Sequence, residues 1–187
     1  MRKLLSALLY TGLLAVANQG AAEIVDIAAL REGDMRKLIV HSEPVAGSEV
    51  AFTAGDGSEM TLAAYEGKYV VLNFWATWCA PCRKEMPMLS EIQTDFGGDD
   101  FEVVTIATGR NLPPAIDRFF AEIGVENLPK YLDPRSALAR DMAVLGLPIT
   151  LILDPNGQEI ARMRGDAEWN GESARAVLKA LLTEADS

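Results

Sequence analysis

Apolar residues along this chain follow two different spacings, and each spacing predicts a different kind of element. Short runs rich in β-branched and aromatic residues are typical of buried strands, whereas apolar positions about three or four residues apart indicate one face of a helix. The runs predict strands at residues 68–75, 101–107, 130–132, 149–153 and 158–164. The helical spacing predicts helices at residues 83–96, 115–123, 136–142 and 173–182.

Turn residues join some of these strands into hairpins. Residues 154–157 read Asp-Pro-Asn-Gly and separate the last two strands with residues that favour a tight turn. Residues 55–57 read Gly-Asp-Gly between two short apolar segments, which predicts a further β-hairpin near the start of the folded part. The order strand, helix, strand, helix, hairpin, helix then predicts an α/β fold with a central mixed sheet and helices on both faces.

The length and the first residues predict how the chain is divided. The 187 residues are enough for one domain with extensions. Arg2 and Lys3 precede an apolar run that is followed by small residues, which is the order found in export signals. This run covers about 14 residues, fewer than the roughly 20 that a membrane-spanning helix needs. We expect a signal peptide or membrane anchor at residues 1–22, a lead-in segment at 23–45 and the folded domain at 46–187.

The charge of the chain bears on its partners. With 27 acidic and 17 basic residues, the formal net charge is −10. Nonspecific binding to nucleic acid requires a basic surface, so nucleic acid is not an expected partner. The single histidine, His41, lies in the lead-in segment, where we expect a solvated side chain.

The two cysteines of the chain, Cys79 and Cys82, stand between the strand at 68–75 and the helix at 83–96. Two cysteines with this spacing can close and reopen a disulfide within one turn of helix. Cys79 is expected at the helix N-terminus, where free backbone N–H groups and the helix dipole stabilise a thiolate. Cys82 is expected to be buried and to react second, and Pro81 suits the first helical turn.

Other uses of a cysteine pair fit this sequence less well. A structural disulfide that closes so short a loop would constrain little of the unfolded chain. A zinc or iron–sulfur site needs about four ligands, whereas the chain offers two cysteines and one distant histidine. No metal and no other cofactor is therefore expected, although transient copper binding by the dithiol stays open.

The residues around the cysteines resemble a known family. Residues 74–82 read Phe-Trp-Ala-Thr-Trp-Cys-Ala-Pro-Cys, and residues 85–87 read Glu-Met-Pro. This motif resembles that of the TlpA/ResA-type thioredoxin-like proteins, which are exported or membrane-tethered thiol–disulfide reductases of bacteria. The resemblance implies a thioredoxin fold with an N-terminal β-hairpin and an inserted helix and strand segment at residues 111–142. Residues 166–169 (Asp-Ala-Glu-Trp) favour the TlpA branch.

The resemblance also implies roles for single residues. Residues 146–150 resemble the family's cis-proline loop, so Pro148 should pack beside Cys79, and the Leu147 backbone should pair with an incoming substrate chain. The expected substrate-contacting residues are Trp78, Ala80, Pro81 and Leu147.

Two positions depart from the wider family. Thioredoxins commonly carry an aspartate that moves protons for the second cysteine, and Asn73 stands at that position here, where we expect a buried amide satisfied by its neighbours. The proton task is then expected to fall to Glu85, one turn after Cys82, because burial can raise the pKa of a carboxyl group. An ordinary exposed helix residue is the alternative for Glu85. Ile149 replaces a threonine or serine of many relatives and should alter substrate fit.

These inferences predict a periplasmic protein thiol–disulfide oxidoreductase that acts as a reductase. The expected substrates are disulfides of exported proteins, such as apocytochrome c or copper-site proteins, and the expected electron donor is a membrane thiol reductant. Ala80 and Pro81 lack the histidine that stabilises the thiolate of strongly oxidising relatives, which favours a reductant. A disulfide oxidase or isomerase and a copper-binding chaperone are the alternatives.

Overall fold

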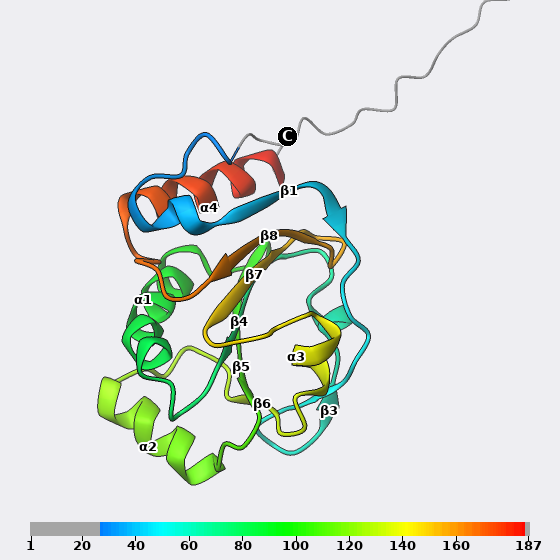
Figure 1. Cartoon of the computed structure of the whole chain (residues 1–187), viewed down its shortest axis with the longest axis vertical. Coiled ribbons are helices and arrows are strands. Elements are labelled where there is room, and N and C mark those ends of the chain that lie inside the picture. Colours follow the sequence, from blue (N-terminus) through cyan, green and yellow to red (C-terminus); the bar gives the residue numbers. More distant parts are fainter. Residues whose placement is uncertain (1–26, 186–187) are drawn as a thin grey trace, which may run out of the picture.

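The computed structural model describes residues 27–185. The strands are β1 (Ile39–Val45), β2 (Phe52–Thr53), β3 (Glu59–Met60), β4 (Tyr69–Trp75), β5 (Phe101–Thr108), β6 (Tyr131–Asp133), β7 (Ile149–Leu153) and β8 (Glu159–Arg164). The α-helices are α1 (Ala80–Phe96), α2 (Pro113–Ile123), α3 (Ala137–Asp141) and α4 (Glu172–Ala185), and the 3-10 helices are η1 (Gly33–Lys37) and η2 (Leu62–Tyr65). The strands form one sheet in the order β1-β8-β7-β4-β5-β6-β2-β3 (Figure 1).

The sheet is mixed, as the sequence predicted. β4 runs parallel to β5 and antiparallel to β7, and β7 in turn is antiparallel to β8. Val70 to Trp75 of β4 are all buried, which is the pattern of a strand covered on both faces. Because β4 lies in the middle of the sheet, the segment that follows Trp75 leaves the sheet from a central strand and not from an outer one.

Helices on both faces divide the core in two. One cluster packs α1, α2 and α4 around Trp75 and Trp169, and the other packs α3 and η2 around Phe74 and Leu151. Neighbouring residues of β4 therefore serve opposite cores, because side chains alternate along a strand. In Figure 1, α1 and α2 lie on one side of the sheet and α3 on the other. This arrangement confirms the predicted thioredoxin-type α/β fold.

The predicted N-terminal hairpin is also present. β2 pairs antiparallel with β3, with Phe52 opposite Met60, and Gly57 takes a left-handed conformation in the turn between them. Thr53 of β2 pairs with Leu132 of β6, which attaches the hairpin to the edge of the sheet. β6 and α3 form within the predicted inserted segment.

Part of the predicted lead-in segment belongs to the sheet, and this corrects the sequence analysis. β1 pairs antiparallel with β8, with Ile39 opposite Arg162. Met35 and Leu38, just before β1, are buried in the core. β1 escaped prediction because its residues are exposed or half-buried without regular alternation, as befits an edge strand.

The start of the chain is not covered by the structure. The predicted signal peptide or membrane anchor at residues 1–22 lies outside the described residues. Within residues 27–185, no helix has the length and apolar character needed to cross a bilayer. The division at residues 22 and 45 stays a prediction, apart from the correction for β1.

Candidate functional site

The cysteine pair lies where β4 passes into α1. Cys79 is the N-cap residue of α1, which begins at Ala80. Cys79 and Cys82 form a disulfide with their Cα atoms 5.3 Å apart, and the backbone N–H of Cys82 donates to Cys79 Sγ over 3.3 Å. The predicted place of Cys79 at the helix N-terminus is confirmed. After reduction, the unpaired N–H groups there favour a thiolate on Cys79.

The two cysteines differ in access to solvent. Cys79 is 6% exposed and Cys82 is 0% exposed. The neighbouring Ala80 and Pro81 are exposed, and Trp78 is 67% exposed. An incoming disulfide therefore meets Cys79 first, because the Cys82 side chain has no contact with solvent.

Glu85 lies one helical turn beyond Cys82 and is fully buried, so it is not the exposed helix residue of the alternative prediction. Asn73 Nδ2 donates to Glu85 Oε1 over 2.8 Å, and Trp169 Nε1 donates to Oε2 over 3.3 Å. Burial raises the pKa of Glu85 from 4.5 to about 7, against the opposing effect of hydrogen bonds from Asn73, the Ala167 backbone and Trp169. A carboxyl group with this pKa can both accept and release a proton near neutral pH.

Asn73 connects Glu85 to the neighbouring strand. Its Nδ2 also donates to Thr150 Oγ1 of β7 over 2.8 Å. Its Oδ1 is buried and has no hydrogen-bond partner among the described residues. The expectation of an amide satisfied by its neighbours therefore holds for the nitrogen and is wrong for the oxygen.

The loop that leads to Pro148, called the docking loop here (residues 143–148), lies beside the cysteine motif. The Leu147–Pro148 peptide bond is cis, as the resemblance implied. Ile149, the first residue of β7, is buried and pairs with Phe74 of β4, so Pro148 follows next to the end of β4. Trp78 and Leu147 line one shared hollow. The direct packing of Pro148 on Cys79 and the effect of Ile149 on substrate fit stay predictions.

A second loop is fastened to the motif from the other side. Asn111, which follows β5, is buried, and its Oδ1 accepts hydrogen bonds from Thr77 N over 2.8 Å and from Thr77 Oγ1 over 3.0 Å. Asn111 Nδ2 donates to the Thr108 carbonyl, which closes the loop on itself. The residues between them, Gly109 and Arg110, are thereby held next to the motif.

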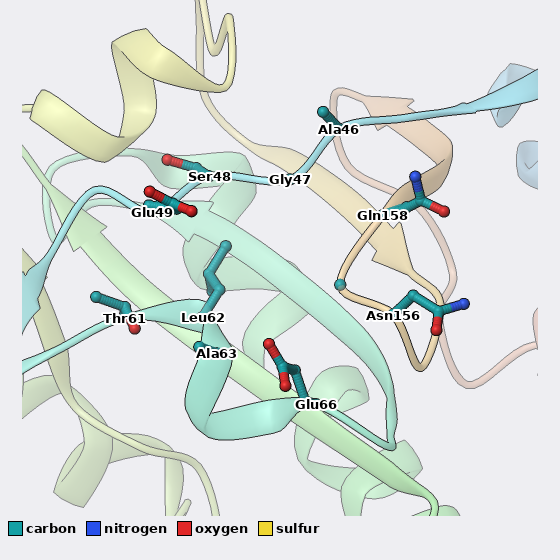
Figure 2. Close-up of a pocket in the computed structure, with 11 residues that line it drawn as sticks. Ala46, Gly47, Ser48, Glu49, Thr61, Leu62, Ala63, Glu66, Asn156 and Gln158 are labelled. Atoms are coloured by element: carbon teal, nitrogen blue, oxygen red, sulfur yellow. The ribbon is translucent and has the colours of Figure 1, made fainter.

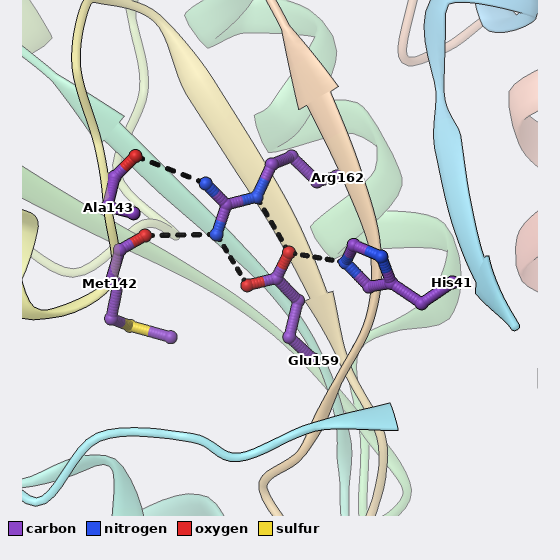
Figure 3. A network of polar contacts seen from close by, with 5 residues as sticks. All are labelled: His41, Met142, Ala143, Glu159 and Arg162. Atoms are coloured by element: carbon purple, nitrogen blue, oxygen red, sulfur yellow. Dashed lines mark hydrogen bonds and ion pairs between the residues drawn. The ribbon is translucent and has the colours of Figure 1, made fainter. Parts of the chain in front are cut away.

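A polar network anchors the docking loop to the sheet (Figure 3). Arg162 of β8 donates to both carboxylate oxygens of Glu159, over 2.7 and 2.6 Å, and to the carbonyl oxygens of Met142 and Ala143, over 2.9 and 3.2 Å. Nε2 of His41 lies 2.7 Å from Glu159 Oε1. The prediction of a solvated His41 is therefore wrong, because β1 brings this residue next to β8.

With this geometry in place, comparison with known proteins shows the family. Residues 46–161 match the AhpC/TSA family. The chain belongs to the AhpC/TSA family. Within it, the chain is 33% identical to "Thiol-disulfide oxidoreductase ResA" of Bacillus subtilis over 110 residues, which cover 59% of this chain and 60% of the relative. It is 32% identical to "Thiol:disulfide interchange protein HelX" of Rhodobacter capsulatus over 126 residues, which cover 67% of this chain and 64% of the relative.

The chain thus spans about three fifths of the length of these relatives. Among solved structures, it resembles a putative thiol:disulfide interchange protein DsbE from Chlorobium tepidum, with a TM-score of 0.65 and 26% identity over 75% of this chain and 98% of that one. A secreted thiol-disulfide isomerase from Corynebacterium glutamicum shares the fold, with a TM-score of 0.67 and 22% identity over 81% of this chain and 93% of that one. The predicted resemblance to TlpA/ResA-type proteins is confirmed, while the preference for the TlpA branch stays a prediction.

Several residues near this site could not be identified from sequence motifs. The sequence singled out Trp169 only as part of the segment at residues 166–169, yet its indole N–H reaches Glu85. Asn111 and Arg162 were not singled out, because an asparagine in a loop and an arginine in a strand carry no spacing signal. What places them near the site is the sheet order, in which β5 and β7 flank β4 and β8 follows β7.

Proposed function

We propose that this chain is a thiol–disulfide oxidoreductase of the bacterial periplasm that reduces disulfides in other exported proteins. The observation that carries the proposal is the pair itself, with the slightly exposed Cys79 at the N-terminus of α1 and the fully buried Cys82 within the same helical turn. The names of the relatives, a thiol-disulfide oxidoreductase and a thiol:disulfide interchange protein, support the same reaction class.

The reaction proceeds in two exchanges. The Cys79 thiolate attacks one sulfur of the partner's disulfide, forms a mixed disulfide and releases the partner's other sulfur as a thiolate. Cys82, once deprotonated, attacks the Cys79 sulfur and releases the first partner sulfur. The partner gains two electrons, and the protein ends with the Cys79–Cys82 disulfide that the structure shows.

Glu85 supplies the base for the second exchange. Cys82 is fully buried, so its proton cannot pass directly to solvent water. Glu85 is the buried carboxyl group nearest to it along α1, and its raised pKa of about 7 suits proton transfer near neutral pH. The proton leaves Cys82 for Glu85 as the Cys82 sulfur attacks, and it is later lost to solvent.

The proposal extends to the partners and the compartment of this protein. The basic residues and apolar run at the start of the chain support export, where structural disulfides form. We propose apocytochrome c or copper-site proteins as substrates and a membrane thiol reductant that returns the Cys79–Cys82 disulfide to the dithiol. Trp78, Ala80, Pro81 and Leu147 are the proposed contacts with the substrate chain.

Trapping tests the exchange mechanism directly. Replacing Cys82→Ser should leave substrates covalently attached to Cys79, because the second exchange cannot occur. The matched Cys79→Ser variant should trap none. Capture in the producing cell, followed by mass spectrometry of the attached protein, identifies the substrate. If Cys82→Ser collects no covalent partner above the Cys79→Ser background, the proposed mechanism is wrong.

The redox potential tests the direction. A reductant should equilibrate with glutathione at a potential below about −200 mV, whereas a value well above this marks an oxidant or isomerase. A copper chaperone would instead bind Cu(I) tightly, lose that binding in either cysteine variant, and fail to reduce insulin.

A further inference from the structure

Large exposed apolar side chains gather around the cysteine motif. Trp78 is 67% exposed, Leu112 is 62% exposed and Leu145 is 94% exposed. Trp78 belongs to the motif, Leu145 to the docking loop, and Leu112 to the loop that Asn111 fastens to Thr77. Among the described residues, the other large apolar side chains that are exposed, Ile39 and Val45, both lie on the edge strand β1. Exposed apolar side chains for contact with a partner are therefore present in the motif and in both neighbouring loops.

Three hollows are lined by Trp78, by Leu145 or by both, and the charged residues of these hollows are mostly basic. One hollow lies between Trp78 and Leu145 and has no charged residue. A second, behind the docking loop, includes Pro148 and Arg164. The third, beside α2, is lined by Thr77, Trp78, Arg83, Ala115, Arg118, Phe119 and Glu122. We call these the motif-side hollows, and together they hold three arginines and one glutamate.

The positive charge of the motif-side hollows is available to a partner. Glu122 is paired with Arg83, whose guanidinium also lies over the Phe119 ring, 4.2 Å from its centroid. Arg118 and Arg164 are exposed, and neither forms an ion pair with any residue that the structure describes. Arg110 extends the basic rim, because it stands between Gly109, which lines the first hollow, and the anchored Asn111.

Hollows elsewhere on the molecule have the opposite charge. The hollow between residues 46–49, η2 and the β7–β8 turn carries Glu49 and Glu66 and no lysine or arginine (Figure 2). A hollow between η1 and the start of α4 carries four acidic residues and no basic one, namely Glu32, Asp34, Glu168 and Glu172. A chain with a net charge of −10 thus has more basic than acidic residues in the motif-side hollows.

We propose that this surface selects partner segments that carry an apolar residue next to the reactive cysteine and acidic residues further along. The proposal rests on the exchange reaction proposed above and adds the class of substrate. At about 0.1 M salt, charges are screened beyond about 10 Å, so a partner docked at the motif feels the nearby arginines more than the distant acidic surface. The arginines then raise the rate of productive encounter with an acidic segment.

Three synthetic peptides test this proposal. Each has one central cysteine with a leucine beside it, held as a mixed disulfide with neutral 2-mercaptoethanol, and the flanks are acidic, uncharged or basic. The reduced protein converts the peptide disulfide to peptide thiol and 2-mercaptoethanol and is itself oxidised, so the rate follows by chromatography of acid-quenched samples. The acidic peptide should react about tenfold faster than the basic one at about 0.1 M salt, and the ratio should shrink at about 1 M salt.

A matched pair of variants locates the effect. The double variant Arg118→Gln with Arg164→Gln should lower the acidic-to-basic rate ratio about threefold or more. The double variant Arg36→Gln with Lys179→Gln makes the same change in net charge at exposed residues that line none of the motif-side hollows, and it should keep the ratio.

The outcomes separate this proposal from the one on which it rests. Equal rates for the three peptides, or equal ratios in the two double variants, would overturn the selectivity and leave the exchange reaction standing. If no peptide, including the uncharged one, oxidises the reduced protein, the exchange reaction itself is refuted.

Discussion

The buried carboxyl group of Glu85 should make the stability of this protein depend on pH in a measurable way. Its pKa rises from 4.5 to about 7 in the folded state, so the folded protein holds this proton more tightly than the unfolded chain does. Stability from this group is therefore fully present below about pH 4.5, falls as the pH rises towards 7, and is level above that. Each pKa unit corresponds to about 1.36 kcal/mol, so the complete change is about 3 kcal/mol.

The variant Glu85→Gln isolates this contribution. Between about pH 5 and pH 8, wild-type protein should lose about 2.5 kcal/mol more of its unfolding free energy than the variant does. In the variant, an amide also takes the place of the carboxylate that accepts the Trp169 N–H. The stability lost in this way does not vary with pH, so it leaves the difference in pH slope unchanged. The assay is urea unfolding of the oxidised protein, in which the cysteines do not titrate, at several pH values.

A control and a kinetic readout complete this experiment. Glu126→Gln removes an exposed carboxylate that forms no ion pair with a described residue, and it should keep the wild-type slope. Under the proposed role, Glu85→Gln should also slow release of substrate from the mixed disulfide by about a hundredfold, while attack by Cys79 keeps its rate. A stability difference between wild type and Glu85→Gln that stays constant from about pH 5 to pH 8 would refute the raised pKa.

Three further changes test neighbouring parts of the structure. Trp169→Phe removes the N–H that reaches Glu85 and should cost about 1–3 kcal/mol in urea unfolding, more at pH 8 than at pH 5, and a pH-independent cost would contradict this. Gly47→Ala would place a methyl group 2.1 Å from the Gly157 carbonyl oxygen and should lower the thermal midpoint by several degrees, equivalent to about 1–3 kcal/mol. Glu159→Gln should lower stability by about 1–3 kcal/mol near neutral pH. Burial opposes ionisation of Glu159, but hydrogen bonds from Arg162 and His41 outweigh the effect of burial and lower the pKa of Glu159. Wild type should therefore lose its extra stability over the variant as the pH falls through that lowered pKa. Extra stability that persists in acid would count against the network.

Most of the fold could be predicted from local pattern. β4 and β5 appear as mostly apolar runs because both of their faces are covered, and α1 and α2 show helical spacing because each buries one face. β1 could not be predicted, because an edge strand with exposed and half-buried residues carries no clear period. Its membership of the sheet depends on pairing with β8, which lies more than a hundred residues away along the chain.

The candidate site also has parts that could be predicted from the sequence and parts that could not. The place of Cys79 and Cys82 at the start of a helix could be predicted from their neighbours in the sequence, and the cis bond at Pro148 from the family resemblance. The surroundings of Glu85 could not, because its hydrogen-bond donors come from β4 and from the segment after β8. Whether a glutamate on a helix is exposed or enclosed depends on those distant segments.

Under the proposed role of Glu85, the hydrogen bonds from Asn73 and Trp169 affect its ability to act as a base. A fully buried carboxylate without donors would keep its proton far above neutral pH and could not accept one from Cys82. The N–H groups of Asn73, Ala167 and Trp169 stabilise the ionised form enough to hold the pKa at about 7. Burial and hydrogen bonding therefore act in opposite directions on the pKa of this one group, and their balance leaves the pKa at about 7. Under the proposed role, burial of Glu85 lowers stability at high pH and places a proton acceptor for the second exchange inside the protein.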